Sequence, residues 1–246
     1  MTRHTARPTT HRTTRRTDAH PDLTRPDAGA PFFSTWRVGT PERQEATVEA
    51  IAGTWERRPW PADGLLAYHV YTGLDGSTLM HHSQWVSEAD YEAFFKTQRQ
   101  ERVDEIDTLV PGIERLRLDR YRRYRSRERA AGDTRVPGLV VIVRIDFEPD
   151  ATERRTDWIG EVLRALAGTP DDHRGLISAH FHLSTDGTHV LNYAEWESEQ
   201  AYDAVLAAPG EGIGDGGEQW ERVRTYPGVK GFTGTRYRHA VGLVPA

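Results

Sequence analysis

The sequence predicts an α+β fold in which two tandem ferredoxin-like βαββαβ units close on each other into a single α/β barrel. Two observations support this prediction. First, residues 64–93 align without a gap with residues 175–204, and ten of the thirty positions are identical, which indicates an internal duplication. Second, both copies show the same order of strand and helix signals, and one such unit alone leaves a face of its sheet uncovered.

The duplication can be followed residue by residue. The identical positions include a histidine, a tryptophan and a tyrosine in each copy, namely His69/His180, Trp85/Trp196 and Tyr91/Tyr202. Farther on, residues 120–122 and 236–238 both read Arg-Tyr-Arg, and the offset between the copies has grown from 111 to 116. The five extra residues coincide with the glycine-rich stretch 209–217. We therefore expect an insertion that interrupts one helix of the second copy only.

The first copy is expected over residues 31–124 and begins with a strand at 32–38. A helix follows Thr40, because the next residue is a proline, which favours the first helical position. Two strands then meet at an Asp-Gly dipeptide at 75–76, which tolerates positive φ and favours a hairpin. A Ser-Glu pair opens the second helix, and the last strand ends at the Arg-Tyr-Arg triplet.

The second copy is expected over residues 137–241 and repeats this order. Its first strand is expected at 139–147, and Asp150 is positioned to cap the helix that follows. A second Asp-Gly dipeptide, at 186–187, predicts the hairpin turn. Again a Ser-Glu pair opens the second helix.

Two segments lie outside the copies. Residues 1–30 are expected to be a disordered leader, because the stretch 1–17 has many arginines and threonines, no acidic residue and almost no large apolar side chain. Such a stretch buries too little surface to offset the entropy lost on ordering. Residues 125–136 are expected to form a charged linker between the copies.

Side-chain alternation indicates a polar cavity in each half. In the second copy, His180 and His182 point to the opposite face from Ala179 and its alternate neighbours, because successive strand residues alternate. On the next strand, Asn192 and Trp196 share a face. One face of the sheet is expected to pack on the helices. The other, which mixes imidazole, amide and indole groups, is expected to line the cavity.

Composition excludes several classes of function. The net charge of −5 and the pI near 6.1 do not favour binding to nucleic acid or to anionic membranes. The chain has no cysteine, which excludes thiol chemistry and favours a reducing, cytoplasmic location. No apolar run approaches the length of a membrane span. Although the chain has eleven histidines, none shows helical metal-ligand spacing, so we expect no metal site.

The hairpin-to-helix segment of each copy resembles the antibiotic biosynthesis monooxygenase family, whose members form dimeric α/β barrels. The residues that carry the resemblance are the Asp-Gly turn, the run Asn192-Tyr-Ala-Glu-Trp196, the Ser-Glu pair and Tyr202. The resemblance covers both copies, and only this segment of each is specific. It implies an intramolecular dimeric α/β barrel, because the second copy takes the place of the partner subunit.

The family resemblance also implies an activity. The chain resembles anthrone- and angucycline-type oxygenases, which use O₂ without metal, haem or bound flavin. It is thus expected to be a monooxygenase of an electron-rich aromatic polyketide in antibiotic biosynthesis, with deprotonation preceding oxygenation. The residues at the family's catalytic spacings are His182 as base, Asn192 as donor to the oxyanion, and Trp196 and Tyr202 as stacking partners.

The first copy is expected to bind substrate rather than to turn it over. It keeps Trp85 and Tyr91 but has Tyr71 and His81 where the second copy has a histidine and an asparagine. These four residues and His180 are the expected binding residues. The family also places an arginine near the end of the second helix, for which the candidates are Arg222 and Arg224.

Two alternative functions remain open, and a third is disfavoured. The first is a ring-opening oxygenase of the same family that receives reduced flavin from a reductase partner. The second is a non-redox polyketide cyclase or a protein that binds a small hydrophobic molecule. A haem-degrading relative is disfavoured, because the position of its ligating histidine is held by Phe95 and Leu206. Assembly into a homodimer also remains open.

Overall fold

A computed structural model of the chain describes residues 12–149, 152–168, 175–207 and 217–246. A short strand, β1 (Thr14–Thr17), precedes two βαββαβ repeats. The first repeat consists of β2 (Ala30–Arg37), α1 (Pro41–Glu56), β3 (Leu65–Gly73), β4 (Thr78–Trp85), α2 (Glu88–Thr97), α3 (Arg99–Leu109) and β5 (Glu114–Arg127). The second consists of β6 (Leu139–Phe147), α4 (Thr152–Gly168), β7 (Leu176–Ser184), β8 (His189–Trp196), α5 (Glu199–Leu206), α6 (Glu218–Arg224) and β9 (Val229–Pro245).

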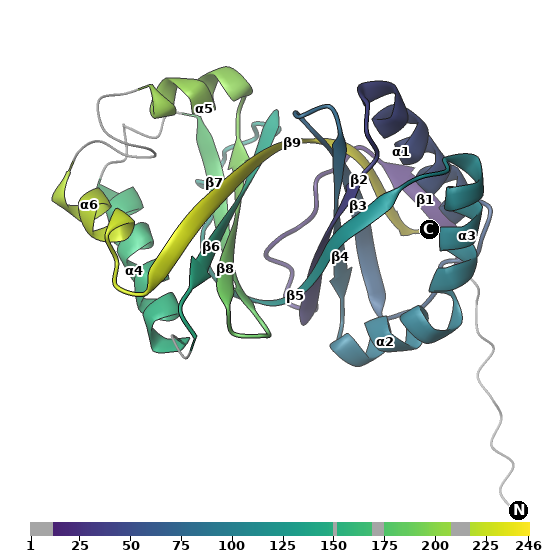
Figure 1. Cartoon of the computed structure of the whole chain (residues 1–246), viewed down its shortest axis with the longest axis horizontal. Coiled ribbons are helices and arrows are strands. Elements are labelled where there is room, and N and C mark those ends of the chain that lie inside the picture. Colours follow the sequence, from purple (N-terminus) through teal and green to yellow (C-terminus); the bar gives the residue numbers. More distant parts are fainter. Residues whose placement is uncertain (1–11, 150–151, 169–174, 208–216) are drawn as a thin grey trace, which may run out of the picture.

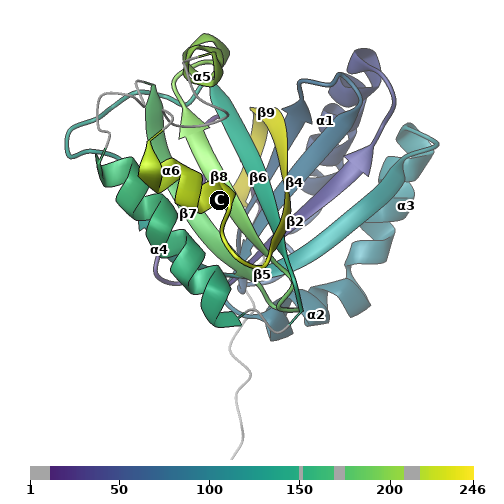
Figure 2. The same ribbon diagram turned by 60° about the vertical axis from the view of Figure 1, so that its left-hand side comes forward.

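The strands form one antiparallel sheet that closes on itself. The order is β1-β9-β3-β4-β2-β5-β7-β8-β6, and β6 pairs in turn with β9. The last strand of each repeat joins the two halves, since β5 pairs with β2 and β7 while β9 pairs with β6 and β3. Helices α1–α3 lie outside one half of the barrel and α4–α6 outside the other (Figure 1, Figure 2). The predicted intramolecular dimeric α/β barrel is therefore confirmed.

Local sequence signals account for the helix starts and the hairpins. The Thr40 side chain accepts a hydrogen bond from the third residue of α1, and Ser87 and Ser198 cap α2 and α5 in the same way. Gly76 and Gly187 have φ values of 68° and 78°, which L-residues with a Cβ rarely adopt. The cap expected at residue 150 lies outside the described residues.

Each half has its own core between sheet and helices. In the first repeat Ile51 of α1 is fully buried, and in the second Ile159 of α4 is fully buried. A third cluster fills the barrel, and its largest members are aromatic: Phe33, Tyr71, Tyr121, Tyr193 and Tyr237. The two outer cores and the barrel interior are thus separate apolar regions divided by the sheet.

The barrel interior also holds the buried histidines His69, His82, His180, His182 and His189, with the half-buried His239 beside His69. They contact one another or neighbouring polar groups. The Nδ1 atom of His69 lies 3.0 Å from Nε2 of His239, and Ser178 links His180 to the Glu195 carboxylate at 3.0 and 2.7 Å.

The prediction of a disordered leader over residues 1–30 is wrong for residues 12–30. Strand β1 pairs with β9 in register from Thr14 opposite Pro245 to Thr17 opposite Gly242. Leu23 is buried in the barrel interior. Composition did not reveal this order, because the edge of β9 that accepts β1 is contributed by the opposite end of the sequence. Residues 1–11 lie outside the described residues.

The helix break is also not confined to the second repeat. In the first, α2 and α3 are separated at Gln98, whose φ of −127° is not helical. The insertion at 209–217 lies outside the described residues except for its last residue. The last strands run past the predicted ends at 124 and 241, to Arg127 and Pro245. Among the described helices, none has both the length and the apolarity to cross a bilayer.

Candidate active site

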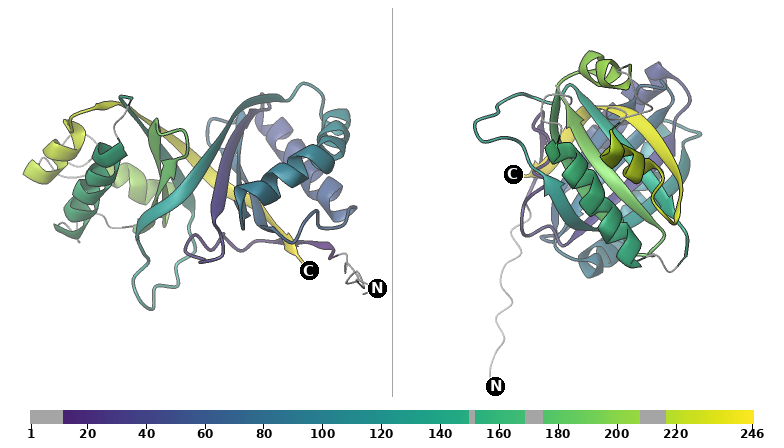
Figure 3. Two further views of the ribbon diagram at one scale, coloured as in Figure 1. Left: turned by 90° about the horizontal axis from the view of Figure 1, so that it is seen from below. Right: turned by 90° about the vertical axis from the view of Figure 1, so that its left-hand side faces the viewer.

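Each repeat encloses a cavity between its sheet and its helices, on the outer side of the barrel wall (Figure 3 shows the helical layers that cover these faces). The cavity of the second repeat measures about 360 Å³ and that of the first about 300 Å³. We call them the second-repeat cavity and the first-repeat cavity. They occupy equivalent places but differ in their lining.

Apolar side chains dominate the second-repeat cavity, and polar groups enter it at a few points. Asn192 and Trp196 come from β8 and Tyr202 from α5. Within the described part of the chain, Oδ1 of Asn192 and Nε1 of Trp196 are buried without a hydrogen-bond partner. An unpaired acceptor and an unpaired donor in an apolar cavity are costly unless a ligand satisfies them.

Tyr202 is held in place by its own repeat. Its ring packs edge-on against Trp196, with centroids 5.1 Å apart, and the Arg236 guanidinium lies 4.9 Å above it. That arginine also forms ion pairs with Glu199 and Asp203. Burial raises the pKa of Tyr202, so its hydroxyl is neutral and can donate a hydrogen bond at physiological pH.

His182 does not join this group, and the prediction that it shares a face of the sheet with Asn192 and Trp196 is wrong. In the β7–β8 hairpin, Phe181 lies opposite Asn192 and His182 lies opposite Leu191. Directly opposed residues share a face of the sheet, so His182 points into the barrel while Asn192 points into the cavity. Its Nδ1 atom lies 3.1 Å from the His180 carbonyl oxygen. Side chains alternate along each strand as predicted, but the register between the two strands, which alternation does not give, places the two residues on opposite faces.

The expected binding residues divide in the same way. His81, Trp85 and Tyr91 line the first-repeat cavity. Tyr71 and His180 lie in the barrel instead, where the Tyr71 hydroxyl is 3.0 Å from that of Tyr193. These two residues therefore cannot contact a ligand held between sheet and helices.

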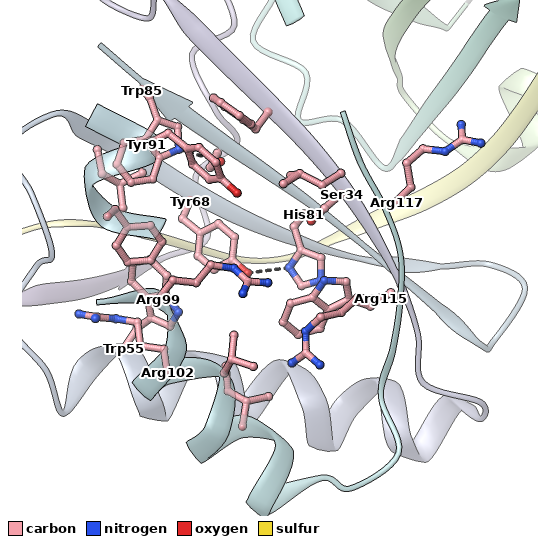
Figure 4. A pocket seen from close by; sticks show the side chains of 18 of the residues that line it. Ser34, Trp55, Tyr68, His81, Trp85, Tyr91, Arg99, Arg102, Arg115 and Arg117 are labelled. Carbon is pink, nitrogen blue, oxygen red and sulfur yellow. Dashed lines mark hydrogen bonds between the residues drawn. The ribbon is translucent and has the colours of Figure 1, made fainter. Parts of the chain in front are cut away.

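The structure adds a residue that the sequence did not single out. Tyr68 lines the first-repeat cavity, and its hydroxyl lies 2.7 Å from Nδ1 of His81 (Figure 4). The aligned residue of the second repeat is Ala179, so identity between the two repeats does not mark this position. The signal that could have found it is its place on β3, on the same face of the sheet as His81 of the paired strand β4.

Electrostatics separates the two cavities further. Burial, together with the nearby Arg115 charge, lowers the pKa of His81 to about 3. Burial also raises the pKa of Tyr68. Both groups are therefore neutral near pH 7. Four arginines, Arg99, Arg102, Arg115 and Arg117, line this cavity.

Of the two arginine candidates in the second repeat, Arg224 lines the cavity. The Arg222 side chain is 62% exposed and pairs with Glu218 on the same helix. At the positions where a haem-ligating histidine would be expected, Phe95 is exposed and Leu206 lines the second-repeat cavity. Within the described residues, no three histidine or carboxylate side chains are grouped so that they could hold a metal ion.

Comparison with known proteins agrees with this architecture. The sequence profile described as antibiotic biosynthesis monooxygenase matches residues 138–210. A stretch of 35 residues is 54% identical to tetracenomycin-F1 monooxygenase of Streptomyces glaucescens, and this match covers 14% of the chain and 31% of that protein.

Solved structures match most of the chain. An anthrone oxidase-like protein has a TM-score of 0.65 at 17% identity, over 88% of this chain and 93% of that one. A chlorite dismutase from Candidatus Nitrospira defluvii has a TM-score of 0.55 at 14% identity, over 89% and 93%. A putative monooxygenase from Lactobacillus acidophilus has 0.53 at 8%, over 86% and 95%. At these identities the structural matches establish the fold alone.

Proposed function

We propose that the chain is a monooxygenase that oxidises an electron-rich polycyclic aromatic polyketide in the second-repeat cavity, a proposal supported by the match of residues 138–210 to the antibiotic biosynthesis monooxygenase profile. O₂ is the co-substrate, and no metal, haem or bound flavin takes part. The observation that carries this proposal is the pair of unsatisfied polar atoms, Oδ1 of Asn192 and Nε1 of Trp196, in an otherwise apolar cavity.

The reaction proposed is the conversion of a methylene group between two aromatic rings into a carbonyl group. Two C–H bonds break, one oxygen atom of O₂ forms the C=O bond, and the other leaves as water with both hydrogens. All four electrons come from the substrate, so the stoichiometry requires no other reductant. An enolate or phenolate form of the substrate can give the first electron to O₂, and the protein must then bind, orient and stabilise that form.

The cavity residues fit these tasks. A phenolic hydroxyl of the substrate can donate to Oδ1 of Asn192, while Nε1–H of Trp196 donates to a neighbouring oxygen on which charge develops. Tyr202 offers a ring face for stacking and a neutral hydroxyl. Arg224 lines the cavity and is ion-paired with Glu221 at 3.0 Å. Its positive charge favours the enolate over the neutral form of the substrate.

Oxygen uptake with 1,8-dihydroxyanthrone tests this proposal. We expect uptake well above the rate without enzyme, unchanged by added reduced flavin, and one atom of ¹⁸O in each product molecule when ¹⁸O₂ is used. Uptake that depends on reduced flavin would instead favour the ring-opening alternative. Binding or cyclisation without uptake would favour the non-redox alternative and refute the proposal.

A further inference from the structure

The first-repeat cavity contains a buried imidazole with one ring nitrogen left over. His81 is 3% exposed, its Nδ1 atom bonds to Tyr68, and its Nε2 atom has no partner among the described residues. Figure 4 shows the side chain pointing into the cavity. A buried polar nitrogen without a partner destabilises the empty protein and is satisfied when a ligand binds.

The tautomer of His81 follows from its partner. The Tyr68 hydroxyl is buried, and the bond it makes in the described structure is the one to Nδ1 of His81. Because a buried hydroxyl proton needs an acceptor, the phenol donates to Nδ1. The proton of the neutral imidazole then lies on Nε2. His81 therefore presents an N–H donor to the cavity and calls for an acceptor.

The charges around this donor are positive. Among the ion pairs of the described residues, Arg115 is paired with Asp107 at 2.8 Å and Arg117 with Asp119 at 3.7 Å. Neither Arg99 nor Arg102 takes part in any of these pairs. Arg102 is buried and donates to the carbonyl oxygens of Gln98 and Pro59 at 3.1 and 2.9 Å. Arg99 is half-buried and close enough to Tyr68 to affect its titration. A ligand that carries negative charge would compensate this excess.

The remaining walls are aromatic and suit a planar molecule. They include Phe32, Trp36, Trp55, Trp85, Tyr91 and Phe94. Flat aromatic side chains favour offset or edge contacts with another ring system. The ring of Trp36 already lies 4.1 Å from that of His81, so an aromatic ligand at the imidazole would contact both.

We propose that the first-repeat cavity is a separate binding site for a planar aromatic molecule that bears an oxyanion, a carboxylate or a phenolate. The oxyanion accepts from Nε2–H of His81, Tyr68 fixes the imidazole, and Arg99 and Arg102 balance the charge. The second-repeat cavity lacks these features, because Ala179 and Asn192 replace the tyrosine and histidine and Phe232 occupies the sheet position of Arg115. This site is independent of any oxygen chemistry in the other cavity.

Calorimetric titration of the full chain tests the site with two matched probes, anthraquinone-2-carboxylate and the neutral 2-(hydroxymethyl)anthraquinone. We expect the carboxylate to bind at least tenfold more tightly. Arg99→Met and His81→Leu should each weaken carboxylate binding about tenfold or more and change binding of the neutral probe little. Arg154→Met, which removes one exposed surface charge, is the control and should leave both affinities unchanged.

Histidine ¹⁵N spectra provide a second readout that does not depend on the leucine variant folding. Adding the carboxylate should shift one imidazole signal, which Tyr68→Phe should perturb in the free protein. Equal affinity for the two probes, or unchanged carboxylate affinity in Arg99→Met, would overturn the proposal. So would loss of carboxylate binding in Gly234→Leu, since Gly234 lines only the second-repeat cavity. None of these measurements requires turnover, so the proposed oxygenase activity and this site can fail separately.

Discussion

The two cavities share a framework of three side chains and differ at two positions of the sheet. In each repeat a tryptophan ends the fourth element of the unit, a tyrosine packs against it from the next helix, and an arginine of the last strand lies over that tyrosine. At these two sheet positions, the first repeat has Tyr68 and His81, and the second has Ala179 and Asn192. The tryptophans also differ, because Nε1 of Trp85 donates to Ser83 at 3.0 Å, whereas Ala194 stands at that place in the second repeat.

This difference teaches that packing kept the framework while the ligand-facing positions diverged. The tyrosine belongs to the core in both halves and its arginine packs over the ring, so their presence alone identifies no working site. Within the described part of the chain, the halves differ in the polar atoms left unpaired. These are Nε2 of His81 and Nε of Arg102 and Arg115 in one cavity, and Oδ1 of Asn192 with Nε1 of Trp196 in the other.

The largest effect is expected in the barrel that both repeats share. Burial lowers the pKa of His82 and of His180 to about 4, from 6.5. The unfolded chain therefore binds more protons than the folded one between pH 6.5 and 4, and stability falls as pH falls through this window. Each imidazole contributes a loss of about 3 kcal/mol by pH 4.

Urea unfolding at a series of pH values, followed by tryptophan fluorescence, measures this loss. Because the barrel belongs to both halves, we expect one transition whose midpoint falls steeply below pH 6. Two separate transitions, or a midpoint that does not change down to pH 4.5, would contradict a shared interior.

The next largest effect concerns Asn192. Asn192→Ala removes the acceptor in the second-repeat cavity, and we expect kcat/KM for anthrone oxidation to fall about 100-fold, as for the loss of a group that orients the substrate. His182→Leu is the matched control from the neighbouring strand, and its turnover per folded molecule should equal that of the wild type. If the histidine variant loses turnover and the asparagine variant does not, the catalytic group lies on the barrel side of the sheet.

A smaller effect is expected from closing the cavity. A Cβ added at Gly234 would meet no atom within 4 Å, and the aligned position of the first repeat holds Leu118, since both residues pair with equivalent positions of β2 and β6. Gly234→Leu should therefore fold normally and, by narrowing the cavity, raise KM about tenfold. An unchanged KM together with an unchanged melting temperature would place the substrate elsewhere.

The smallest effect concerns the indole donors. Ala194→Ser should give Nε1 of Trp196 the internal partner that Ser83 gives Trp85, and kcat should fall about threefold, because the donor is shared with the protein. The reciprocal change, Ser83→Ala, should leave anthrone oxidation unaltered and cost about 1 kcal/mol of stability. A rise in kcat for Ala194→Ser would mean that the free indole is not used in the reaction.

The sequence predicted the parts of this molecule that depend on local or repeated signals. The duplication gave the barrel, and the hairpin-to-helix segment placed Asn192, Trp196 and Tyr202 together, because their relative positions depend on one short stretch of chain. Features that depend on the register or the partner of a strand are not given by such signals. The register of the β7–β8 hairpin places His182 on the barrel side of the sheet, and the partner of β1 lies at the other end of the sequence.

Because the last strand of the second repeat pairs with strands of the first, it also determines when the first repeat can finish folding. The inner face of the first repeat is completed by β9, which pairs His69 with Gly242 and Thr14 with Pro245. On the ribosome, the first repeat must therefore wait with its histidine-bearing face open until β9 has been synthesised. Contacts of such large sequence separation slow folding, and during the delay a neighbouring nascent chain can offer the same strand. Intermolecular exchange of β9, which yields domain-swapped oligomers, is thus the misfolding route that this topology favours at high rates of synthesis.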